Sequence, residues 1–445
     1  MDRYEYDINN PLDIERYAKR LEGHCIADFL PAQVINAANK GNFGQLVERF
    51  LGIPTNSTPG ADFSTIGGAN VEVKSLPLIE TRNGLRAKER LVFNIIDYRS
   101  ICDENWDNSS FLAKNKLILL VTYLYEHAKN PFEYCVKTVR LLDLTNIPHD
   151  DLRIMKEDWE KIVSVIRAGH AESLSESITF YLGACTKGST AADSLRAQPF
   201  SSIPAKQRAF SWKPSYLNHV LTELCCEQNN GHSVFGNYTG SLTFEQLVIS
   251  MFNKFRDQSA EEIALAIGKQ YDTSSKRYLS LVTKAILGAS EDEDINEFIN
   301  ADVQVKTICL EKGGRLKESI SFPYIRYKDV IDEKWEDSTL RNMLDKKFFF
   351  VVFQKTDTGR RLKKALFWNI PIEILENDVR RVWEYTIDLI RQERFDELPG
   401  MCWNPVCHVR PHGMNSEDTT ETVSGRLVGK KCFWLNNTFI LSQIN

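Results

Sequence analysis

The chain has 445 residues, of which 42% are hydrophobic and 26% charged, and its formal net charge is −5. This length predicts two domains, with three as the alternative. Because the net charge is negative, the chain as a whole does not attract nucleic acid electrostatically. Any nucleic-acid binding would depend on a local groove of basic residues. No stretch reaches the roughly 20 apolar residues of a membrane helix, and the N-terminal MDRYEYDINN is too polar for a signal peptide. Because the ten cysteines contain no CxxC pair, we expect free thiols and a cytoplasmic protein.

The first half of the chain predicts alternating helices and strands. The expected helices span 13–29, 39–52 and 157–169, and the expected strands span 71–78, 91–97 and 116–125. The apolar residues of 39–52 recur at helical spacing and form one stripe, namely Phe43, Leu46, Val47, Phe50 and Leu51. The polar, glycine-containing segment 225–240 reads as a linker, which gives domains of 1–228 and 229–445.

Four segments of the first half recur in the second half, in the same order. They are GQLVERFLG (44–52) and EQLVISMFN (245–253), NVEVKSLPL (70–78) and DVQVKTICL (302–310), KNKLILLV (114–121) and DKKFFFVV (345–352), and WEKIVSVIR (159–167) and WEYTIDLIR (383–391). Any one of these similarities could arise by chance. Their common order predicts that the second half is a diverged copy of the first.

Asp62, Glu72 and Lys74 form a D…ExK pattern. Glu72 and Lys74 are two residues apart on a predicted strand and therefore project from the same face. Asp62 precedes them across a turn-rich loop and can be brought beside Glu72. Two carboxylates and the carbonyl of Val73 would form an all-oxygen site suited to Mg²⁺, with Glu48 as an outer carboxylate. Spacing alone does not separate this interpretation from the solvated face of an edge strand.

The run KGNFGQLVERFLG…DFSTIGGANVEVKSLPL resembles the central motif of the MutH family of mismatch-repair and GATC-cutting restriction endonucleases, a KGxxGxLLE-like helix followed by DFxxLGVELKTIP. The resemblance covers most of residues 12–216. It implies a mixed sheet flanked by helices, the PD-(D/E)xK fold, in two tandem copies. It also implies magnesium-dependent cleavage of double-stranded DNA that leaves 5′-phosphates.

The resemblance also assigns roles to individual positions. Asp62, Glu72 and Lys74 match the catalytic residues of the family, and Glu48 matches its helix carboxylate. A further catalytic lysine falls on Lys114, with Lys116 as the alternative placement.

The DNA-reading segments of the first half depart from the family pattern. The Arg-Pro-Lys loop reads Cys-Thr-Lys here, so that only Lys187 is kept. In RAFSWKPSY, Ser211 stands at the position of a tyrosine that senses adenine methylation, and Lys213 follows it. We expect Lys187, Ser211 and Lys213 to face DNA, with little discrimination against N6-methyladenine.

The second half resembles the family more weakly and lacks its metal-binding residues. Gln304 replaces the catalytic glutamate and Ile249 replaces the helix carboxylate, while Asp294 and Lys306 remain at matching spacings. We expect this half to be catalytically inactive. Its segments HVRPHG (408–413) and KCFWLNNTF (431–439) resemble the DNA-reading parts of the family, which makes Arg410, His412 and Trp434 candidate DNA-binding residues. An ordinary structural domain is the alternative.

These observations favour a type II restriction endonuclease with an active first domain and a DNA-binding or pseudo-dimeric second domain. Its expected partners are double-stranded DNA and a cognate methyltransferase, and the protein is expected to be a monomer in solution that can dimerise on DNA. A nicking enzyme of mismatch repair and a non-enzymatic DNA-binding protein are the two alternatives.

Overall fold

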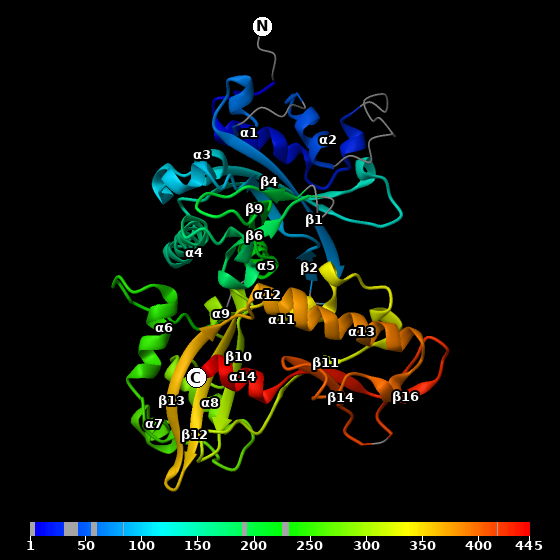
Figure 1. The fold of residues 1–445 in the computed structure, drawn as a ribbon. Helices are drawn as coiled ribbons and strands as arrows, with labels where there is room; N and C mark the ends of the chain where they lie inside the picture. The colour runs from blue at the N-terminus through cyan, green and yellow to red at the C-terminus, as the bar shows by residue number, and fades with distance from the viewer. Residues whose placement is uncertain are drawn as a thin grey trace. The chain divides into compact units, whose positions relative to one another are not determined.

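The computed structural model describes residues 5–30, 43–54, 60–82, 84–188, 194–224, 231–415 and 417–445. The chain divides into two compact mixed α/β units (Figure 1). The first comprises residues 1–174 and 179–229, and the second comprises 175–178 and 230–445. Within the described residues, no helix is long and apolar enough to cross a membrane.

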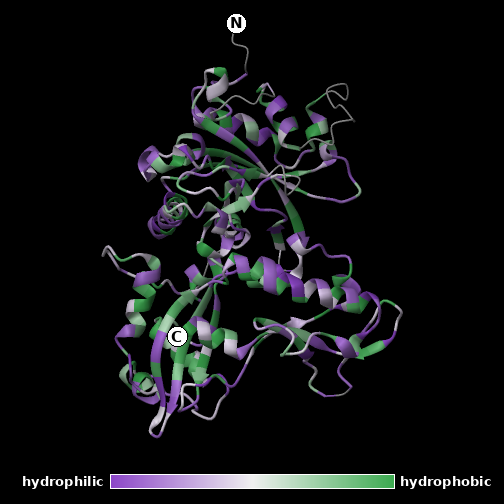
Figure 2. Cartoon of the chain, viewed as in Figure 1, coloured by the Kyte–Doolittle hydropathy of each residue, from purple (hydrophilic) through white to green (hydrophobic). Residues whose placement is uncertain are grey.

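The first unit is built on a four-stranded sheet in the order β2-β1-β4-β5. Its strands are β1 Val71–Thr81, β2 Gly84–Ala87, β4 Leu117–Leu124 and β5 Val136–Asp143. β1 and β4 run parallel, and the other neighbours are antiparallel. Residues 118–122 of β4 are all buried, which accounts for the unbroken apolar run of this strand (Figure 2).

A smaller antiparallel sheet in the order β3-β9-β6 completes the first unit. Its strands are β3 Leu91–Ile95, β6 Leu182–Thr186 and β9 Arg208–Trp212, and a short hairpin of β7 Leu195–Arg196 and β8 Ala205–Lys206 lies between β6 and β9. The helices of this unit are α1 Pro11–Ala18, α2 Phe43–Phe50, α3 Ser110–Asn115, α4 His149–Arg167 and α5 Pro214–Leu224.

The apolar stripe of α2 forms part of the core. Phe43, Leu46 and Val47 are buried and share one hydrophobic cluster with Val71 and Val73 of β1. Leu51 is buried as well, whereas Phe50 is half-buried. This packing confirms the predicted stripe and holds α2 close to the start of β1, where the candidate site lies.

The second unit contains a sheet in the order β10-β12-β13, a sheet in the order β11-β17-β14 and a β15-β16 hairpin. Its strands are β10 Gln304–Leu310, β11 Ile320–Tyr324, β12 Phe348–Thr356, β13 Gly359–Trp368, β14 Cys407–Pro411, β15 Thr419–Glu421, β16 Leu427–Gly429 and β17 Lys431–Leu435. Its helices are α6 Phe244–Asn253, α7 Ala260–Ala266, α8 Tyr278–Ile286, α9 Asn296–Asn300, α10 Tyr327–Val330, α11 Thr339–Leu344, α12 Ile372–Ile374, α13 Arg380–Arg391 and α14 Asn437–Ile444.

The two units share a topology. β1 pairs parallel with β4 and β4 antiparallel with β5; β10 pairs parallel with β12 and β12 antiparallel with β13. In each small sheet the last strand along the chain lies between the other two. Because the four sequence similarities fall on corresponding helices and strands, we infer that the second half arose as a copy of the first.

The correspondence extends to single side chains. Ser109 and Ser338, both fully buried, are the N-caps of α3 and α11, and each side chain accepts a hydrogen bond from a backbone N–H three residues later. A tryptophan three residues before each cap packs against a tryptophan of the long helix, Trp106 on Trp159 and Trp335 on Trp383. Such matched details support the duplication more strongly than topology alone.

Several predicted boundaries were wrong. The expected helix 13–29 ends at Ala18 and continues as a 3₁₀ turn to Leu21, because Gly23 takes a positive φ of 80° that a helix does not allow. The helix predicted over 157–169 begins earlier, at His149. Residues 39–42 of one expected helix and 225–230 of the expected linker lie outside the described residues.

Candidate active site

The loop before β1 places Asp62 beside the strand. Its Oδ2 accepts a hydrogen bond from the Val73 N–H at 2.8 Å, so that the carboxylate lies next to the residue between Glu72 and Lys74. Burial raises the pKa of Asp62, and the nearby Glu72 raises it further, while the Val73 N–H, Lys74 and Lys114 oppose the shift. A single hydrogen bond between residues eleven positions apart therefore holds Asp62 against the strand.

Glu72 is the most enclosed carboxylate of the group and is only 3% exposed. Its Oε1 lies 2.7 Å from Lys74 Nζ and 3.5 Å from Lys114 Nζ. Its Oε2 is buried and has no hydrogen-bond partner among the described residues. An ionised oxygen in that position is costly unless a cation or a bound polar group satisfies it.

Lys114 lies in the last turn of α3, just before β4 begins beside β1. Asn115 fixes this junction, because its buried side-chain amide donates to Asn94 Oδ1 at 3.0 Å and to the Phe111 carbonyl at 2.9 Å. Lys116, the alternative placement for the further lysine, is exposed. The geometry thus favours Lys114. The sequence reasoning did not single out Asn115, although a polar residue between two lysines at the head of an apolar strand was a usable signal.

Glu48 adds a third carboxylate from α2. Burial, followed by the charges of Asp62 and Glu72, raises its pKa to about 7, and Lys74 opposes this shift. The charges of Asp62, Glu72 and Lys74 all act on Glu48, which puts its carboxyl group in their neighbourhood. The sequence prediction placed all of these residues together, and the structure brings them together.

This cluster fits a divalent cation. Two of its carboxylates have raised pKa values because of burial and mutual repulsion, and Glu72 Oε2 is buried with no hydrogen-bond partner among the described residues. Within the described part of the chain, no group of three or more His, Cys, Asp and Glu side chains is close enough to enclose a metal alone. Mg²⁺ does not require such an enclosure, because it keeps several of its own waters and needs only one or two carboxylates.

The corresponding part of the second unit is organised differently. The Gln304 amide donates to Asp302 Oδ1 at 2.9 Å, and Asp302 also pairs with Lys346. Asp294, which matches Asp62 by spacing, is exposed, and within the described residues its carboxylate pairs with Lys284 at 3.8 Å. Burial alone lowers the pKa of Lys306, with no carboxylate contributing to the shift. The spacing match at Asp294 therefore does not reproduce the arrangement of Asp62.

Two of the three residues predicted to face DNA in the first unit are buried. Ser211 is fully buried on β9, and Lys213 is 8% exposed, with its ammonium group donating to the Thr179 carbonyl. Both positions correct the prediction, since in this conformation neither presents a surface to DNA. Lys187 lies half-exposed directly after β6, and its backbone N–H donates to the Gln207 carbonyl.

The three candidate DNA-binding residues of the second unit do meet. The guanidinium carbon of Arg410 lies 3.7 Å from the centre of the Trp434 ring, and the His412 ring packs edge-on against the same indole at 5.6 Å. Arg410 and His412 are exposed and Trp434 is half-buried. β14 and β17, which carry Arg410 and Trp434, pair antiparallel. The arrangement gives an exposed cation supported by an aromatic face.

Comparison with known proteins finds similarity over the part of the chain that carries most of this cluster. Residues 51–158 match the model of the family described as DNA mismatch repair enzyme MutH. The matched span contains Asp62, Glu72, Lys74 and Lys114, the residues that converge on the start of β1. Fold and site together define the class: the first unit is a restriction-endonuclease-like domain of the MutH type.

Individual relatives indicate which type of endonuclease the chain resembles. The chain is 28% identical over 482 aligned positions to the type II restriction enzyme Sau3AI of Staphylococcus aureus, and the alignment covers 97% of each chain. DNA mismatch repair proteins MutH are similar over a shorter part. The protein of Vibrio vulnificus (strain YJ016) is 26% identical over 41% of this chain and 78% of its own, and that of Shewanella sp. (strain W3-18-1) is 27% identical over 31% and 57%. The chain is a type II restriction endonuclease, a site-specific deoxyribonuclease with a MutH-like nuclease domain.

Proposed function

We propose that this endonuclease cuts both strands of DNA at GATC, requires Mg²⁺ and leaves 5′-phosphates. The observation that carries the proposal is the cluster at the start of β1. There Asp62 accepts the Val73 N–H, and Glu72 is held between Lys74 and Lys114. The target tetranucleotide rests on the resemblance of the central motif to the MutH family.

Asp62, Glu72 and the Val73 carbonyl would hold the metal ion, with Glu48 as an outer ligand. Bound Mg²⁺ supplies Lewis acidity and lowers the pKa of its water, which makes a stronger nucleophile at neutral pH. The protein contributes the positions of the carboxylates. Asp62 is fixed by its bond to the strand backbone, and Glu72 is fixed by burial.

Lys74 and Lys114 would act on the nucleophile and on the phosphate. Each ammonium group lies within 3.5 Å of Glu72 Oε1, so that both are aimed at the volume next to the carboxylates. Lys74 orients the attacking water and takes part in its deprotonation. Lys114 stabilises the negative charge that builds up on the phosphate as the bond to the leaving oxygen breaks.

The second unit would bind DNA without cutting it, as an effector or as the second half of a pseudo-dimer. Gln304 and Ile249 replace two carboxylates, and Gln304 is tied to Asp302. Arg410, His412 and Trp434 would form its DNA contact, and Lys187 would serve the first unit. We further propose a cytoplasmic monomer that can dimerise on DNA and is paired with a methyltransferase that protects the host genome.

A mismatch-repair nicking function is the weaker candidate. The MutH proteins named above align with 31% and 41% of this chain, whereas the restriction enzyme aligns with 97%. A second unit with the topology of the first is unexplained by the repair role. A non-enzymatic role would not explain why Asp62, Glu72 and Lys74 lie together at the start of β1.

Digestion of plasmids that carry one, two or no GATC sites tests the proposal. With Mg²⁺, the full chain should linearise plasmids at these sites, and the fragment ends should be ligatable without added phosphate. EDTA should stop the reaction, and Glu72→Gln should be inactive under the same conditions. Nicked circles as the final product would favour the repair role. Cutting of the plasmid without GATC at an equal rate would refute the target.

A further inference from the structure

The β7–β8 hairpin of the first unit carries an unusual apolar tip. Phe200 is 75% exposed and Ile203 is 56% exposed, between strands that pair Leu195 with Lys206 and Arg196 with Ala205. Single exposed apolar side chains are common on protein surfaces, but here two large ones lie on the same short hairpin.

The backbone at Phe200 is strained. Its φ is +63°, a conformation that costs a non-glycine residue free energy and that asparagine or glycine would adopt more readily. The strain is not relieved by burial, because the ring lies outside the core. A strained and exposed phenylalanine points to a functional requirement for that side chain at that place.

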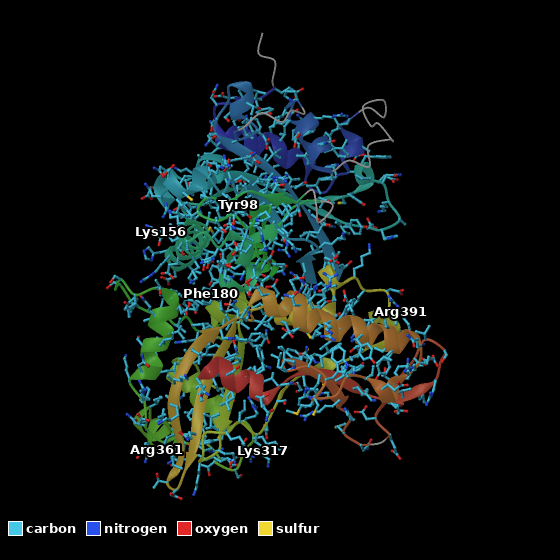
Figure 3. All side chains as sticks on the ribbon, in the orientation of Figure 1. Tyr98, Lys156, Phe180, Lys317, Arg361 and Arg391 are labelled. Atoms are coloured by element: carbon cyan, nitrogen blue, oxygen red, sulfur yellow. The ribbon has the colours of Figure 1, made fainter. Side chains whose placement is uncertain are left out.

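The surrounding residues hold the tip in place. Gln198 is 6% exposed; its side-chain oxygen accepts from the Ala171 N–H at 2.8 Å, and its amide donates to the Ile203 carbonyl at 2.7 Å. Gly169 passes so close that an added Cβ would lie 2.7 Å from the Phe200 carbonyl oxygen. At the base of the hairpin, the Tyr98 hydroxyl, labelled in Figure 3, donates to the Lys206 carbonyl. The hairpin is therefore anchored along its length.

The hairpin segment carries only positive charge, although Glu172 of the preceding 3₁₀ turn accepts a hydrogen bond from Gln198 at 2.6 Å. Residues 194–213 include Arg196, Lys206, Arg208 and Lys213 and contain no aspartate or glutamate, although the chain as a whole is acidic. Arg196 and Lys206 are exposed, whereas Arg208 and Lys213 are buried. An apolar tip with exposed cations at its base is complementary to a duplex, whose phosphates lie outside stacked bases.

The hairpin also leaves the small sheet at the end nearest the active site. Cys185 and Ile95 both pair with Ala209 at that end of the sheet. Asn94, one residue earlier on β3, accepts the hydrogen bond from Asn115, which is the neighbour of Lys114. The base of the hairpin and the Asn94–Asn115 contact beside Lys114 therefore lie at the same end of the small sheet.

The second unit offers an internal comparison. Its β15–β16 hairpin lies between β14 and β17, at the matching place in the topology, and its exposed apolar residues include Val423 at 57% and Leu427 at 67%. Residues 417–430 are mixed in charge, with Glu417, Asp418 and Glu421 beside Arg426 and Lys430. The apolar hairpin is common to both copies, but only in the first does the hairpin segment itself, residues 194–213, carry basic residues and no acidic ones.

We propose that Phe200 is a wedge that enters the DNA duplex at or beside the target and unstacks a base step. This proposal rests on the proposed function, since it takes the duplex substrate as given. Apolar side chains inserted between base pairs kink DNA by about 20–90° and allow it to contact more of the protein. Phe200 would then be a positioning residue that brings the scissile phosphate to Asp62, Glu72 and the two lysines.

A fluorescence measurement of base unstacking tests directly whether Phe200 enters the duplex. Target duplexes are prepared with 2-aminopurine at successive positions in and beside GATC, and each is bound to the full chain carrying Glu72→Gln so that it is not cut. One position should brighten several-fold, and the added change Phe200→Ala should abolish the increase while Phe200→Leu keeps part of it. The matched control is Leu12→Ala, which removes another large apolar side chain, 68% exposed, from α1.

Cleavage and stability complete the test. With Glu72 intact, Phe200→Ala should lower kcat/KM about 10- to 100-fold, whereas Leu12→Ala should leave it unchanged. Phe200→Gly should have an equal or higher Tm, because glycine accepts the positive φ, and should still lose the fluorescence increase. Unchanged fluorescence and cutting in Phe200→Ala would overturn the proposal. A change in sedimentation mass without a change in fluorescence would also overturn it, in favour of a protein contact. Failure of the unmodified chain to cut GATC would instead contradict the proposed function.

Discussion

At the scale of the residue, the candidate site depends on how a nearly inaccessible carboxylate is neutralised. Glu72 is 3% exposed and has two lysines within 3.5 Å of Oε1. A buried charge is tolerated only when it is paired, and removal of one partner leaves the other uncompensated. The second Glu72 oxygen remains unsatisfied among the described residues, which is the feature that a metal ion would complete.

We expect Asp62→Ala, Glu72→Ala and Lys74→Ala each to reduce cleavage at least about a thousandfold, which corresponds to about 4 kcal/mol of transition-state stabilisation. These groups act on metal, water and phosphate, so that specific DNA binding should be largely kept. Plasmid cleavage and gel-shift assays measure the two effects. The control is Gln304→Ala at the corresponding position of the second unit. Near-normal cutting by any of the first three variants would remove that residue from the site.

Lys114 and Lys116 form a matched pair. Lys114→Ala should reduce cleavage about 10- to 1000-fold, because an ammonium group placed where charge develops has an effect of that order. Lys116→Ala should cut nearly as well as the parent chain, since Lys116 is exposed directly before β4 begins. Single-turnover cleavage rates distinguish the two. The opposite ranking would show that Lys116 is the further catalytic lysine.

Glu48 should make the metal-free protein less stable as the pH rises. Its pKa is raised from 4.5 to about 7 in the fold, so that the folded state binds more protons than the unfolded state between these values. Glu48 contributes at most about 3 kcal/mol to the free energy of unfolding. This contribution is fully present below about pH 4.5 and is lost as the pH rises through about 7. In EDTA, the difference in Tm between Glu48→Gln and the parent chain should grow in favour of the variant from pH 5 to pH 7.5. A difference independent of pH would contradict the shift.

At the scale of the element, a short helix positions one of the proposed catalytic side chains. α3 has six residues, yet it carries Lys114 and leads directly into β4. A helix this short has little stability of its own and depends on its cap and its packing. Its N-cap Ser109 is fully buried and accepts the Leu112 N–H, while its own hydroxyl donates to the Trp106 carbonyl. Long helices of both units instead present alternating hydrophobic and hydrophilic residues, as α13 does in Figure 2.

The duplicated caps provide an element-level test. Ser109→Ala and Ser338→Ala should each destabilise their helix by about 0.5–2 kcal/mol, because each leaves a backbone N–H without its acceptor. Amide hydrogen exchange of Leu112 and Arg341 measures this locally. Only Ser109→Ala should also slow cleavage, because α3 positions Lys114. Equal loss of activity in both variants would indicate that the second unit supports catalysis through its own α11.

At the scale of the whole molecule, the chain contains one topology twice with different chemistry in each copy. Both units have a parallel strand pair extended by an antiparallel strand, and a small sheet with an inserted hairpin. The first keeps the carboxylates and the lysines, and the second keeps an exposed arginine stacked on tryptophan. This difference is the basis for proposing that the first unit cuts DNA and the second binds it.

Changes in the second unit should separate binding from cutting. Asp294→Ala and Lys306→Ala should leave cleavage nearly unchanged, because neither lies in an arrangement like that of Asp62. Arg410→Ala and His412→Ala should weaken DNA binding, by about 1–3 kcal/mol if Arg410 reads a base. Binding titrations at several salt concentrations distinguish a base contact from a phosphate contact. Unchanged binding in Arg410→Ala and His412→Ala would leave a structural role for this unit.

The sequence by itself predicted the nuclease chemistry of the first unit and a second half that copies its fold. Strand alternation predicted that Glu72 and Lys74 share one strand face, the helical stripe predicted the buried side of α2, and the repeated segments indicated a duplication. These signals depend on residues that are close along the chain or that recur at a fixed period, and the sequence contains such patterns directly.

Only the tertiary structure decided which of the predicted site residues lie close to one another. Asp294 has the right spacing but lies exposed beside Lys284, and Ser211 and Lys213 are buried although their motif suggested a DNA-facing segment. Lys114 rather than Lys116 reaches Glu72 because Asn115 fixes the end of α3. The strain and exposure of Phe200 have no counterpart in sequence pattern. Burial and long-range contact depend on how distant segments pack, and the spacing of residues along the chain does not specify that packing.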